Sequence, residues 1–392
     1  MTDGSPKDPS QGGAAALAVS PAARELHRRA LVWDAHMDSL HRALVDDLDL
    51  SRRSAANGDL DRWQEGGIDV QVLAVWVDTI YLPHHAMRRA LHQVDLCHRL
   101  AEANPRRMAL ARSAADVRRI TDGGRLAVLL ALEGGAVFGD DLAQLRTLYR
   151  LGVRSVTLTH SASTTWADAS TDAPRWRGLN DFGRDVIREM NRLGIVVDVT
   201  HVSDDTVLDV LEVSRAPIIA SHSNARALCD HPRNLSDTLI RDIAATGGVI
   251  GVNFYPPFLD ESARDAMTGG AGDLLRFLNE PVDVVPARLD EVAVQRSRAF
   301  QAVTDIPSVP LGRLLDHIDH IVAVAGVEHV GLGSDMDGIN AFPQGLESAA
   351  DFPRITEGLL RRGYTEDGIL AILGGNFMRV LEQVQDSAVT AA

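Results

Sequence analysis

Lysine is nearly absent from this chain of 392 residues. Lys7 is the only lysine, and arginine supplies the rest of the 39 basic side chains. A Schiff base, a cofactor aldimine and a carbamylated lysine between two metals all require a lysine amine within the fold. The sequence therefore excludes these three kinds of chemistry. We interpret the scarcity of lysine itself as a codon bias.

Cysteine is scarce as well, and excess positive charge and long apolar runs are missing. Only Cys97 and Cys229 occur, which is too few for a disulfide framework. The formal net charge is −15, whereas nucleic acid or an anionic membrane would require a basic face. No window approaches the roughly 18 apolar residues of a membrane span. We therefore expect a globular chain with neither a nucleic-acid nor a membrane partner.

The two ends of the chain have the composition of tails. Residues 1–20 are rich in small residues, glycine and proline, and lack the pattern of a signal peptide. We expect this segment to be disordered, residues 385–392 to be frayed, and residues 21–384 to form one domain. The missing secretion signal favours a cytoplasmic location. The oligomeric state is left open, with a homodimer as one candidate.

Short apolar runs alternate with longer helical patterns along the chain, which indicates repeated βα units and a parallel sheet. Eight runs are expected to be strands: Leu31–Asp38, Asp69–Val77, Leu126–Glu133, Val153–His160, Ile195–His201, Pro217–His222, Gly247–Asn253 and His329–Asp335. Eight parallel strands predict an α/β fold of the (β/α)₈ TIM-barrel type. An open doubly wound sheet is the alternative, but no G-x-G-x-x-G turn follows the first strand.

Two segments between the strands have features of their own. Asp181 to Leu193 carries apolar residues at a helical period and is followed by Gly194, a helix-stop signal. The stretch from Asn253 to His329 is longer than the other connections and holds a helical pattern over Leu289 to Val303. We interpret about residues 255–310 as an enlarged insertion after the seventh strand. It could form a lid, a subunit contact or a helical elaboration without a catalytic role.

Most of the expected strands finish on a side chain that can bind a metal. These residues are His36, Asp38, Glu133, His160, His201, His222 and Asp335. All C-terminal ends of the strands of one parallel barrel meet at the same rim. A lone histidine at a strand end is more often structural, but the joint pattern is not expected by chance. Imidazoles and carboxylates together suit zinc and other divalent ions.

The number of expected ligands exceeds one tetrahedral zinc site, so two metals that share a carboxylate would use the set better. Since no lysine can bridge the metals, a carboxylate must, and Glu133 is the best placed. Nine other histidines lack such a strand-end position and are interpreted as structural or solvent-facing: His41, His84, His85, His92, His98, His231, His317, His320 and His329.

The motifs in sequence order resemble those of the membrane (renal) dipeptidase family, zinc dipeptidases with an amidohydrolase-like barrel. The matching segments are Asp34-Ala-His-Met-Asp38, Leu132-Glu-Gly-Gly135, Thr157-Leu-Thr-His160, Trp166-Ala-Asp168, Asp198-Val-Thr-His201, Ser221-His-Ser223, Arg233-Asn234 and Gly331 to Gly338. The resemblance covers about Leu31 to Glu382. It implies hydrolysis of dipeptides, with a D-residue accepted at the C-terminal position.

The resemblance also implies a role for each matching residue. His36 and Asp38 would hold one Zn²⁺, His201 and His222 a second, and Glu133 would bridge them. A metal-bridging hydroxide would attack the peptide bond. Asp335 would act as acid/base and contact the substrate. His160 and Arg233 would bind the substrate, with His160 stabilising the developing oxyanion and Arg233 pairing with a carboxylate.

Two other hypotheses remain open from the sequence. The first is a different binuclear hydrolase on the same barrel, namely a lactonase, a deaminase or a phosphotriesterase. The second is a barrel that kept the scaffold as a binding module without catalysis. The complete set of strand-end ligands argues against the second hypothesis. The spacing of Asp335 and Asp337 alone does not decide which of them is the acid/base.

Overall fold

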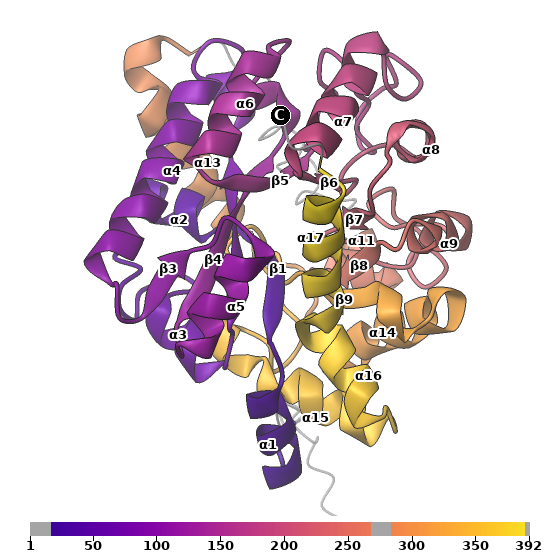
Figure 1. Cartoon of the computed structure of the whole chain (residues 1–392). Coiled ribbons are helices and arrows are strands. Elements are labelled where there is room, and N and C mark those ends of the chain that lie inside the picture. The colour runs from indigo at the N-terminus through magenta and orange to yellow at the C-terminus, as the bar shows by residue number, and fades with distance from the viewer. Residues whose placement is uncertain (1–16, 268–283, 304, 389–392) are drawn as a thin grey trace, which may run out of the picture.

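The computed structural model describes residues 17–267, 284–303 and 305–388. Its sheet has nine parallel strands, eight of which follow one another around a ring (Figure 1). The ring strands in order are β1 (Trp33–Met37), β2 (Val70–Trp76), β4 (Leu126–Glu133), β5 (Val153–Thr157), β6 (Val196–Asp198), β7 (Ile218–Ala220), β8 (Val249–Val252) and β9 (Val330–Leu332). The ninth strand, β3 (Met108–Leu110), pairs with the start of β4 and was not expected from the sequence.

The ring closes between its first and last strands. Just beyond β9, the Asp335 amide donates to the His36 carbonyl at 3.0 Å, and the Asp38 amide donates to the Met336 carbonyl at 2.9 Å. The buried Asp34 carboxylate on β1 accepts from the Ser334 amide at 2.8 Å and from its hydroxyl at 2.7 Å. These contacts join residues about three hundred positions apart. The predicted (β/α)₈ TIM-type barrel is confirmed.

Helices cover the outside of the ring and fill most connections between its strands (Figure 1). The described helices are α1 (Pro21–Arg29), α2 (Ser39–Asp46), α3 (Leu60–Glu65), α4 (Ala86–Ala103), α5 (Ala114–Asp122), α6 (Leu142–Leu151), α7 (Asp181–Leu193), α8 (Asp204–Val213), α9 (Asp237–Ala245), α10 (Pro256–Leu259), α11 (Glu261–Ala266), α13 (Leu289–Gln301), α14 (Leu311–Ala325), α15 (Pro353–Arg361), α16 (Glu366–Leu370) and α17 (Asn376–Asp386). The predicted helix over Asp181 to Leu193 is α7. Gly194 ends it at a φ of 72°, where a residue without Cβ is favoured.

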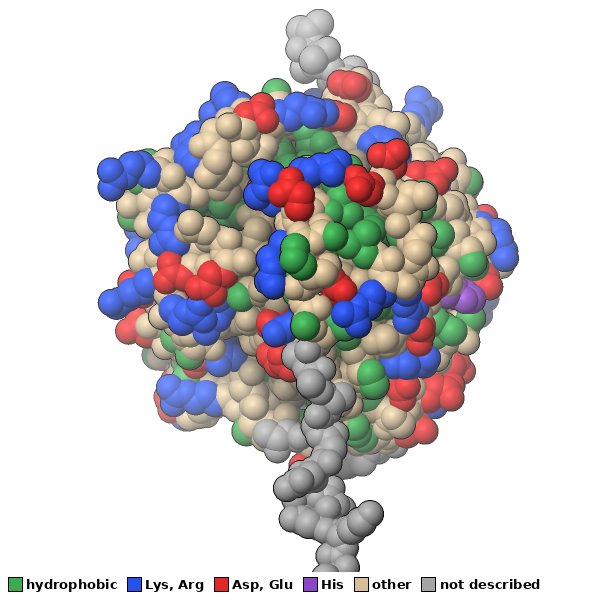
Figure 2. Space-filling view, turned by 90° about the horizontal axis from the view of Figure 1, so that it is seen from below, with side chains coloured by type: hydrophobic (Ala, Val, Ile, Leu, Met, Phe, Trp, Pro, Cys, Tyr) green, Lys and Arg blue, Asp and Glu red, His purple; other side chains and the backbone are tan. Residues whose placement is uncertain are grey.

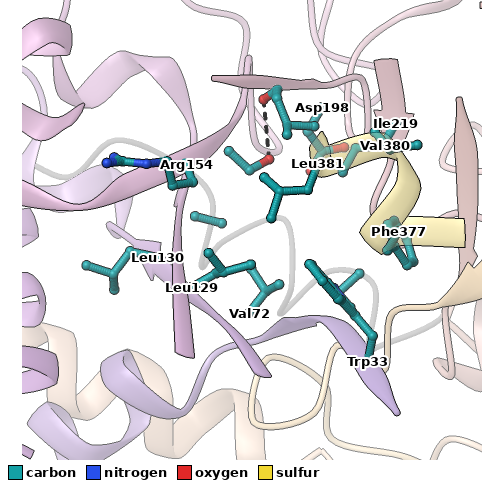
Figure 3. A pocket seen from close by; sticks show the side chains of 14 residues that line it. Trp33, Val72, Leu129, Leu130, Arg154, Asp198, Ile219, Phe377, Val380 and Leu381 are labelled. Carbon is teal, nitrogen blue, oxygen red and sulfur yellow. Dashed lines mark hydrogen bonds between the residues drawn. The ribbon is translucent and has the colours of Figure 1, made fainter. Parts of the chain in front are cut away.

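The interior of the barrel is filled by side chains at its N-terminal end. Residues on the inner face of the strands pack with the apolar face of α17, which crosses the ring in Figure 1. Phe377 stacks on Trp33 with ring centroids 6.0 Å apart. A Cβ at Gly331 would lie 2.3 Å from the Phe377 ring, so a larger residue there would displace the ring. A cavity of about 40 Å³ remains between this apolar layer and Asp198 (Figure 3).

The longest connection lies between β8, the seventh ring strand, and β9, as the sequence predicts. Its described part contains α10, α11, α13 and α14. α13 corresponds to the helical pattern predicted over Leu289 to Val303. It packs against α2, the helix that follows β1. Residues 268–283 of the predicted insertion lie outside the described residues. The insertion therefore brings a helix from late in the chain to the elements that follow β1 and β2.

The surface combines charges of both signs. On the lower face, near α1, α15 and α16, basic and acidic side chains are interspersed (Figure 2). Among the described helices, none combines the length and hydropathy that crossing a bilayer would require. Residues 1–16 of the predicted N-terminal tail and 389–392 of the C-terminal tail lie outside the described residues, while α17 continues to Asp386.

Candidate active site

The side chains predicted to bind metal lie together at the carboxyl end of the ring. Three groups have ligand atoms that all lie within 4.8 Å of one another: His36 with Asp38 and Glu133, Glu133 with His201 and His222, and His36 with His222 and Asp335. Glu133 ends β4 and belongs to the first two groups. The strand order places it between the β1 ligands on one side and the histidines after β6 and β7 on the other. This is the position that a bridging carboxylate would occupy.

The two carboxylate oxygens of Glu133 face different histidines. Oε2 lies 3.3 Å from His36 Nε2, which in turn lies 3.4 Å from Asp38 Oδ2. Oε1 lies 3.1 Å from His201 Nε2 and 3.6 Å from His222 Nε2. All of these side chains are buried or nearly so. The Glu133 carboxylate thus divides the cluster into two sets of ligand atoms. Oε2 faces His36 and its neighbour Asp38, and Oε1 faces His201 and His222.

A hydrogen-bond chain fixes the orientation of His222. The Ser221 hydroxyl donates to Asp198 Oδ2 at 2.5 Å and lies 2.8 Å from His222 Nδ1. Because the hydroxyl proton is used on the carboxylate, Nδ1–H donates to the hydroxyl oxygen, which leaves Nε2 with its lone pair. Thr157 also donates to Asp198 Oδ2, at 2.8 Å. His222 Nε2 is therefore held as an acceptor that faces Glu133.

The cluster fits divalent cations. His201 Nε2 and His222 Nε2 lie 3.1 Å apart and face the same Glu133 oxygen. Burial lowers the pKa of both histidines well below the usual range, so both imidazoles are in the neutral form that ligates metals. Among the described residues, His36 Nε2 and Asp38 Oδ1 are buried without a hydrogen-bond partner. Buried acceptors that converge in this way are stabilised when a cation lies between them.

The two aspartates after β9 have different surroundings. Asp335 Oδ2 accepts from Asn253 Nδ2 at 2.8 Å, and its carboxylate lies in the metal-capable group with His36 and His222. Burial raises the pKa of Asp335 to about 7. The Asp337 carboxylate instead accepts from the Ser39 hydroxyl at 2.5 Å and from the amides of Asn57 at 2.7 Å and Gly58 at 3.3 Å.

Asp337 is therefore occupied in holding the loop before α3, and Asp335 is the aspartate that faces the ligand cluster. Gly338 keeps the approach open, because a Cβ there would lie 2.2 Å from Asp38 Oδ2 and 2.8 Å from Asp335 Oδ1. Of the two aspartates between which the sequence does not decide, only Asp335 shares a metal-capable group with His36 and His222 among the described residues.

Arg233 is a buried cation at the edge of the cluster. Its side chain is 5% exposed, and neither Nη1 nor Nη2 has a hydrogen-bond partner among the described residues. The guanidinium lies over the Phe258 ring, 5.3 Å from its centroid. Burial lowers the pKa of Arg233 to about 10, which keeps it charged at neutral pH. A planar donor pair without an internal partner is suited to a carboxylate ligand.

His160 lies next to the histidine cluster, with its ring centroid 4.4 Å from that of His201. Burial lowers the pKa of His160 to about 3, and the nearby Arg233 adds to this shift. The imidazole is therefore neutral at physiological pH. Nδ1 lies 2.8 Å from the Ser161 hydroxyl. When that hydroxyl donates to Nδ1, Nε2–H is free to donate to a ligand in the pocket.

The backbone is strained at three residues in or beside the ligand cluster. His201, Asp335 and Asp337 have positive φ angles of 72°, 59° and 66°. Residues with a Cβ rarely adopt this conformation, and they persist in it where surrounding contacts enforce it, often at functional sites. At His201 and Asp335 the strained backbone presents the side chain to the cluster.

A pocket of about 320 Å³ opens over the cluster and includes residues that the sequence analysis left out. His41 and His231, interpreted as structural from the sequence, lie in its wall. The other unanticipated lining residues include Trp76, Asp78, Tyr255, Phe258, Arg296 and Phe300. Arg296 and Phe300 come from α13, so the insertion contributes directly to the pocket. No local pattern in the sequence shows that α13 folds back over the end of β2.

Comparison with known proteins identifies relatives over nearly the whole chain. The family model described as membrane dipeptidase (Peptidase family M19) matches residues 21–392. A dipeptidase named tcpJ from Claviceps purpurea is 33% identical over 373 residues, which is 91% of this chain and 78% of that protein. Dipeptidase 3 of Rattus norvegicus is 34% identical over 346 residues, or 87% of this chain and 61% of the rat protein.

Solved structures give the same result. The probable dipeptidase PvdM from Pseudomonas aeruginosa superposes with a TM-score of 0.78 at 26% identity, covering 94% of this chain and 98% of that one. A metallopeptidase from Rhodobacter sphaeroides, solved with a phosphinate mimic of the dipeptide L-Ala-D-Ala, gives a TM-score of 0.72 at 25% identity. That comparison covers 90% of this chain and 99% of the other.

Proposed function

Since the chain belongs to the membrane dipeptidase family (Peptidase family M19) and is a metallopeptidase of the dipeptidase type, we propose that it hydrolyses dipeptides with two bound Zn²⁺ ions. The observation that carries this proposal is the buried guanidinium of Arg233, whose Nη1 and Nη2 have no hydrogen-bond partner among the described residues and which lies beside the cluster around Glu133. A dipeptide supplies both a carboxylate for the arginine and an amide carbonyl at the cluster.

The proposed division of ligands follows the two groups around Glu133. His36 and Asp38 would hold one ion, His201 and His222 would hold the other, and Glu133 would contribute to both. When bound, the two ions would acidify water and polarise the scissile carbonyl at neutral pH. Ser221 and Asp198 keep the His222 ring in the tautomer that ligation requires.

Asp335 is the proposed proton carrier. Its pKa, raised by burial to about 7, suits a group that takes a proton from water and returns it to the departing amine. Asn253 holds one carboxylate oxygen, which leaves the other to exchange the proton. His160, neutral and directed into the pocket, donates Nε2–H to the oxygen on which negative charge develops.

Arg233 is the proposed receptor for the substrate's terminal carboxylate and thus limits the substrate to one residue after the scissile bond. A residue added after the second one would move the terminal carboxylate away from the guanidinium. The side chain of the second residue needs no particular chirality for this contact, so we propose that D-residues are accepted there. The similar Rhodobacter sphaeroides structure, solved with an L-Ala-D-Ala mimic, supports this part of the proposal.

The test is a substrate panel with the metal-loaded protein. It compares L,L- and L,D-dipeptides with tripeptides, esters, lactones, purine and pyrimidine bases, and phosphotriesters. We expect both kinds of dipeptide to be the best substrates by kcat/KM. A lactone, a base or a phosphotriester that is turned over far better than every dipeptide would contradict the proposed function.

A further inference from the structure

The pocket has a second charged wall, on the side opposite Arg233. Arg233 lies on the loop after β7, and Asp78 follows β2 by two residues. In the ring order, β2 and β7 are four strands apart, which places them across the barrel from each other. Asp78 lines the pocket together with Trp76, whose backbone is in register with that of Glu133. The ligand cluster thus lies between Arg233 and Asp78.

Asp78 is buried, with 6% of the residue exposed, and the hydrogen bonds to its carboxylate reach only one of the two oxygens. Arg296 Nη1 donates to it at 3.1 Å, the Ile80 amide at 3.0 Å and the Thr79 hydroxyl at 3.4 Å. All three of these hydrogen bonds end on Oδ1, and none from the described residues ends on Oδ2. A carboxylate oxygen accepts more than one hydrogen bond, so a buried carboxylate used on one oxygen has capacity for a further donor.

The two arginines near Asp78 are matched by two carboxylates, so this wall of the pocket has no excess positive charge. Arg296 pairs with Asp78, while Arg89 lies 3.8 Å from Asp290 and over the Tyr81 ring. The Tyr81 hydroxyl also donates to Asp290 at 2.7 Å. These contacts attach α13 to the segment after β2 and keep Asp78 in place. A cation that enters the pocket would therefore meet a fixed carboxylate whose charge is not outweighed by the two arginines.

We propose that Asp78 receives the α-ammonium group of the substrate's first residue, an inference that rests on the proposed dipeptidase function. A dipeptide has one charge at each end, and the pocket offers the opposite charge on each side: Arg233 to the carboxylate and Asp78 to the ammonium. Asp78 is then a specificity-determining residue that requires a free amino end. It rejects N-acylated dipeptides and peptides extended at the amino end.

The kinetic test compares alanyl-D-alanine with its desamino analogue, propionyl-D-alanine, in the parent and in Asp78→Asn. A hydrogen bond to a charged group is worth about 10–100-fold. We expect the parent to prefer the free-amine substrate by at least about that factor in kcat/KM, and Asp78→Asn to lose most of this preference. Equal kcat/KM values for the two substrates in the parent, or an unchanged preference in Asp78→Asn, would overturn the proposal.

Two controls separate this role from others. Asp290→Asn weakens the attachment of α13 without touching Asp78, so it should change both substrates by a similar factor and keep their ratio. Lysyl-D-alanine and norleucyl-D-alanine test whether the carboxylate instead binds a cationic side chain. If Asp78→Asn changes their ratio and leaves the free-amine preference intact, the proposal is wrong.

A binding measurement distinguishes failure of this inference from failure of the proposed function. The metal-loaded parent and Asp78→Asn are titrated with a phosphinate mimic of L-Ala-D-Ala and with its desamino counterpart. Tighter binding of the free-amine mimic by the parent alone supports Asp78 as the ammonium receptor, even if dipeptides are not cleaved. Equal binding of both mimics by the parent contradicts it, even if dipeptides are cleaved.

Discussion

Asn253 Nδ2 donates a hydrogen bond of 2.8 Å to Oδ2 of Asp335. The two residues follow β8 and β9, adjacent strands of the ring, so the contact spans neighbouring strand ends. A neutral amide thereby fixes a buried carboxylate that faces the metal-capable cluster without supplying a counter-charge. Burial raises the pKa of Asp335 to about 7, which suits the acid/base role proposed for it.

Replacement of Asp335 by asparagine should leave the ligand set intact and remove the proton carrier. We expect Asp335→Asn to retain its metal content and to lose about 10²–10⁴-fold in kcat. Asp337→Asn is the matched control, because Asp337 holds the loop at Asn57 and Gly58 and should affect stability more than turnover. A larger loss of kcat in Asp337→Asn than in Asp335→Asn would reverse the two roles.

Glu133→Gln should disrupt paired metal binding, since one carboxylate faces both histidine groups and the fold contains no lysine that could replace it. Inductively coupled plasma mass spectrometry of the purified variant should give fewer than two equivalents. Glu357→Gln removes another buried carboxylate, on α15, and should keep the parent's metal content. A Glu133→Gln protein with two tightly held ions and normal turnover would show that Glu133 is not the bridge.

Arg233 should make the enzyme sensitive to the substrate's terminal carboxylate. Blocking that group as an amide leaves the buried guanidinium unpaired, which costs roughly 2–5 kcal/mol in transition-state binding. In the parent, kcat/KM for a dipeptide should therefore exceed that for its C-terminal amide by about thirtyfold or more. Arg233→Ala should reduce this ratio to near unity. Equal rates for the two substrates in the parent would mean that Arg233 does not bind the carboxylate.

His317 should make folding stability depend on pH. Its Nδ1 accepts from the Ala225 amide at 3.1 Å and its Nε2 lies 3.0 Å from the Leu259 carbonyl, so the neutral ring satisfies both contacts. Burial lowers the pKa of His317 to about 4. The unfolded chain takes up this proton near pH 6.5, so the stabilisation is complete above pH 6.5 and is lost as the pH falls toward 4.

The expected loss from this one histidine is about 3 kcal/mol of unfolding free energy between pH 6.5 and pH 4. Urea unfolding of the metal-free parent and of His317→Gln, at several pH values in this range, isolates the contribution, because the other buried histidines are common to both. Parallel pH dependences of the two proteins would show that His317 titrates normally in the fold.

Much of the barrel and the clustering of its metal-capable side chains could be predicted because the information is local. Each ring strand is a short apolar run, and parallel strands bring their C-terminal residues to one rim whatever lies between them. The meeting of His36, Glu133, His201 and His222 at one rim was therefore predictable from strand ends alone. The structure adds the division of the Glu133 oxygens between two groups, which depends on side-chain directions that spacing does not determine.

The parts that could not be predicted depend on contacts between distant segments. Asp78 and Arg296 lie 218 positions apart and meet only because α13 returns to the end of β2. The distinction between Asp335 and Asp337 likewise depends on which residues donate to them: Asn253, just after β8, in one case and the loop before α3 in the other. A sequence motif identifies neither contact, since both are set by tertiary packing.

The proposed hydrolysis of dipeptides depends on one Glu133-bridged pair of Zn²⁺ ions. It is tested most directly by adding Zn²⁺ in measured equivalents to metal-free protein and following hydrolysis of alanyl-D-alanine together with bound metal. Activity should rise with bound zinc and reach its plateau at two equivalents per chain. Full dipeptidase activity at one equivalent, or none at two, would contradict the account.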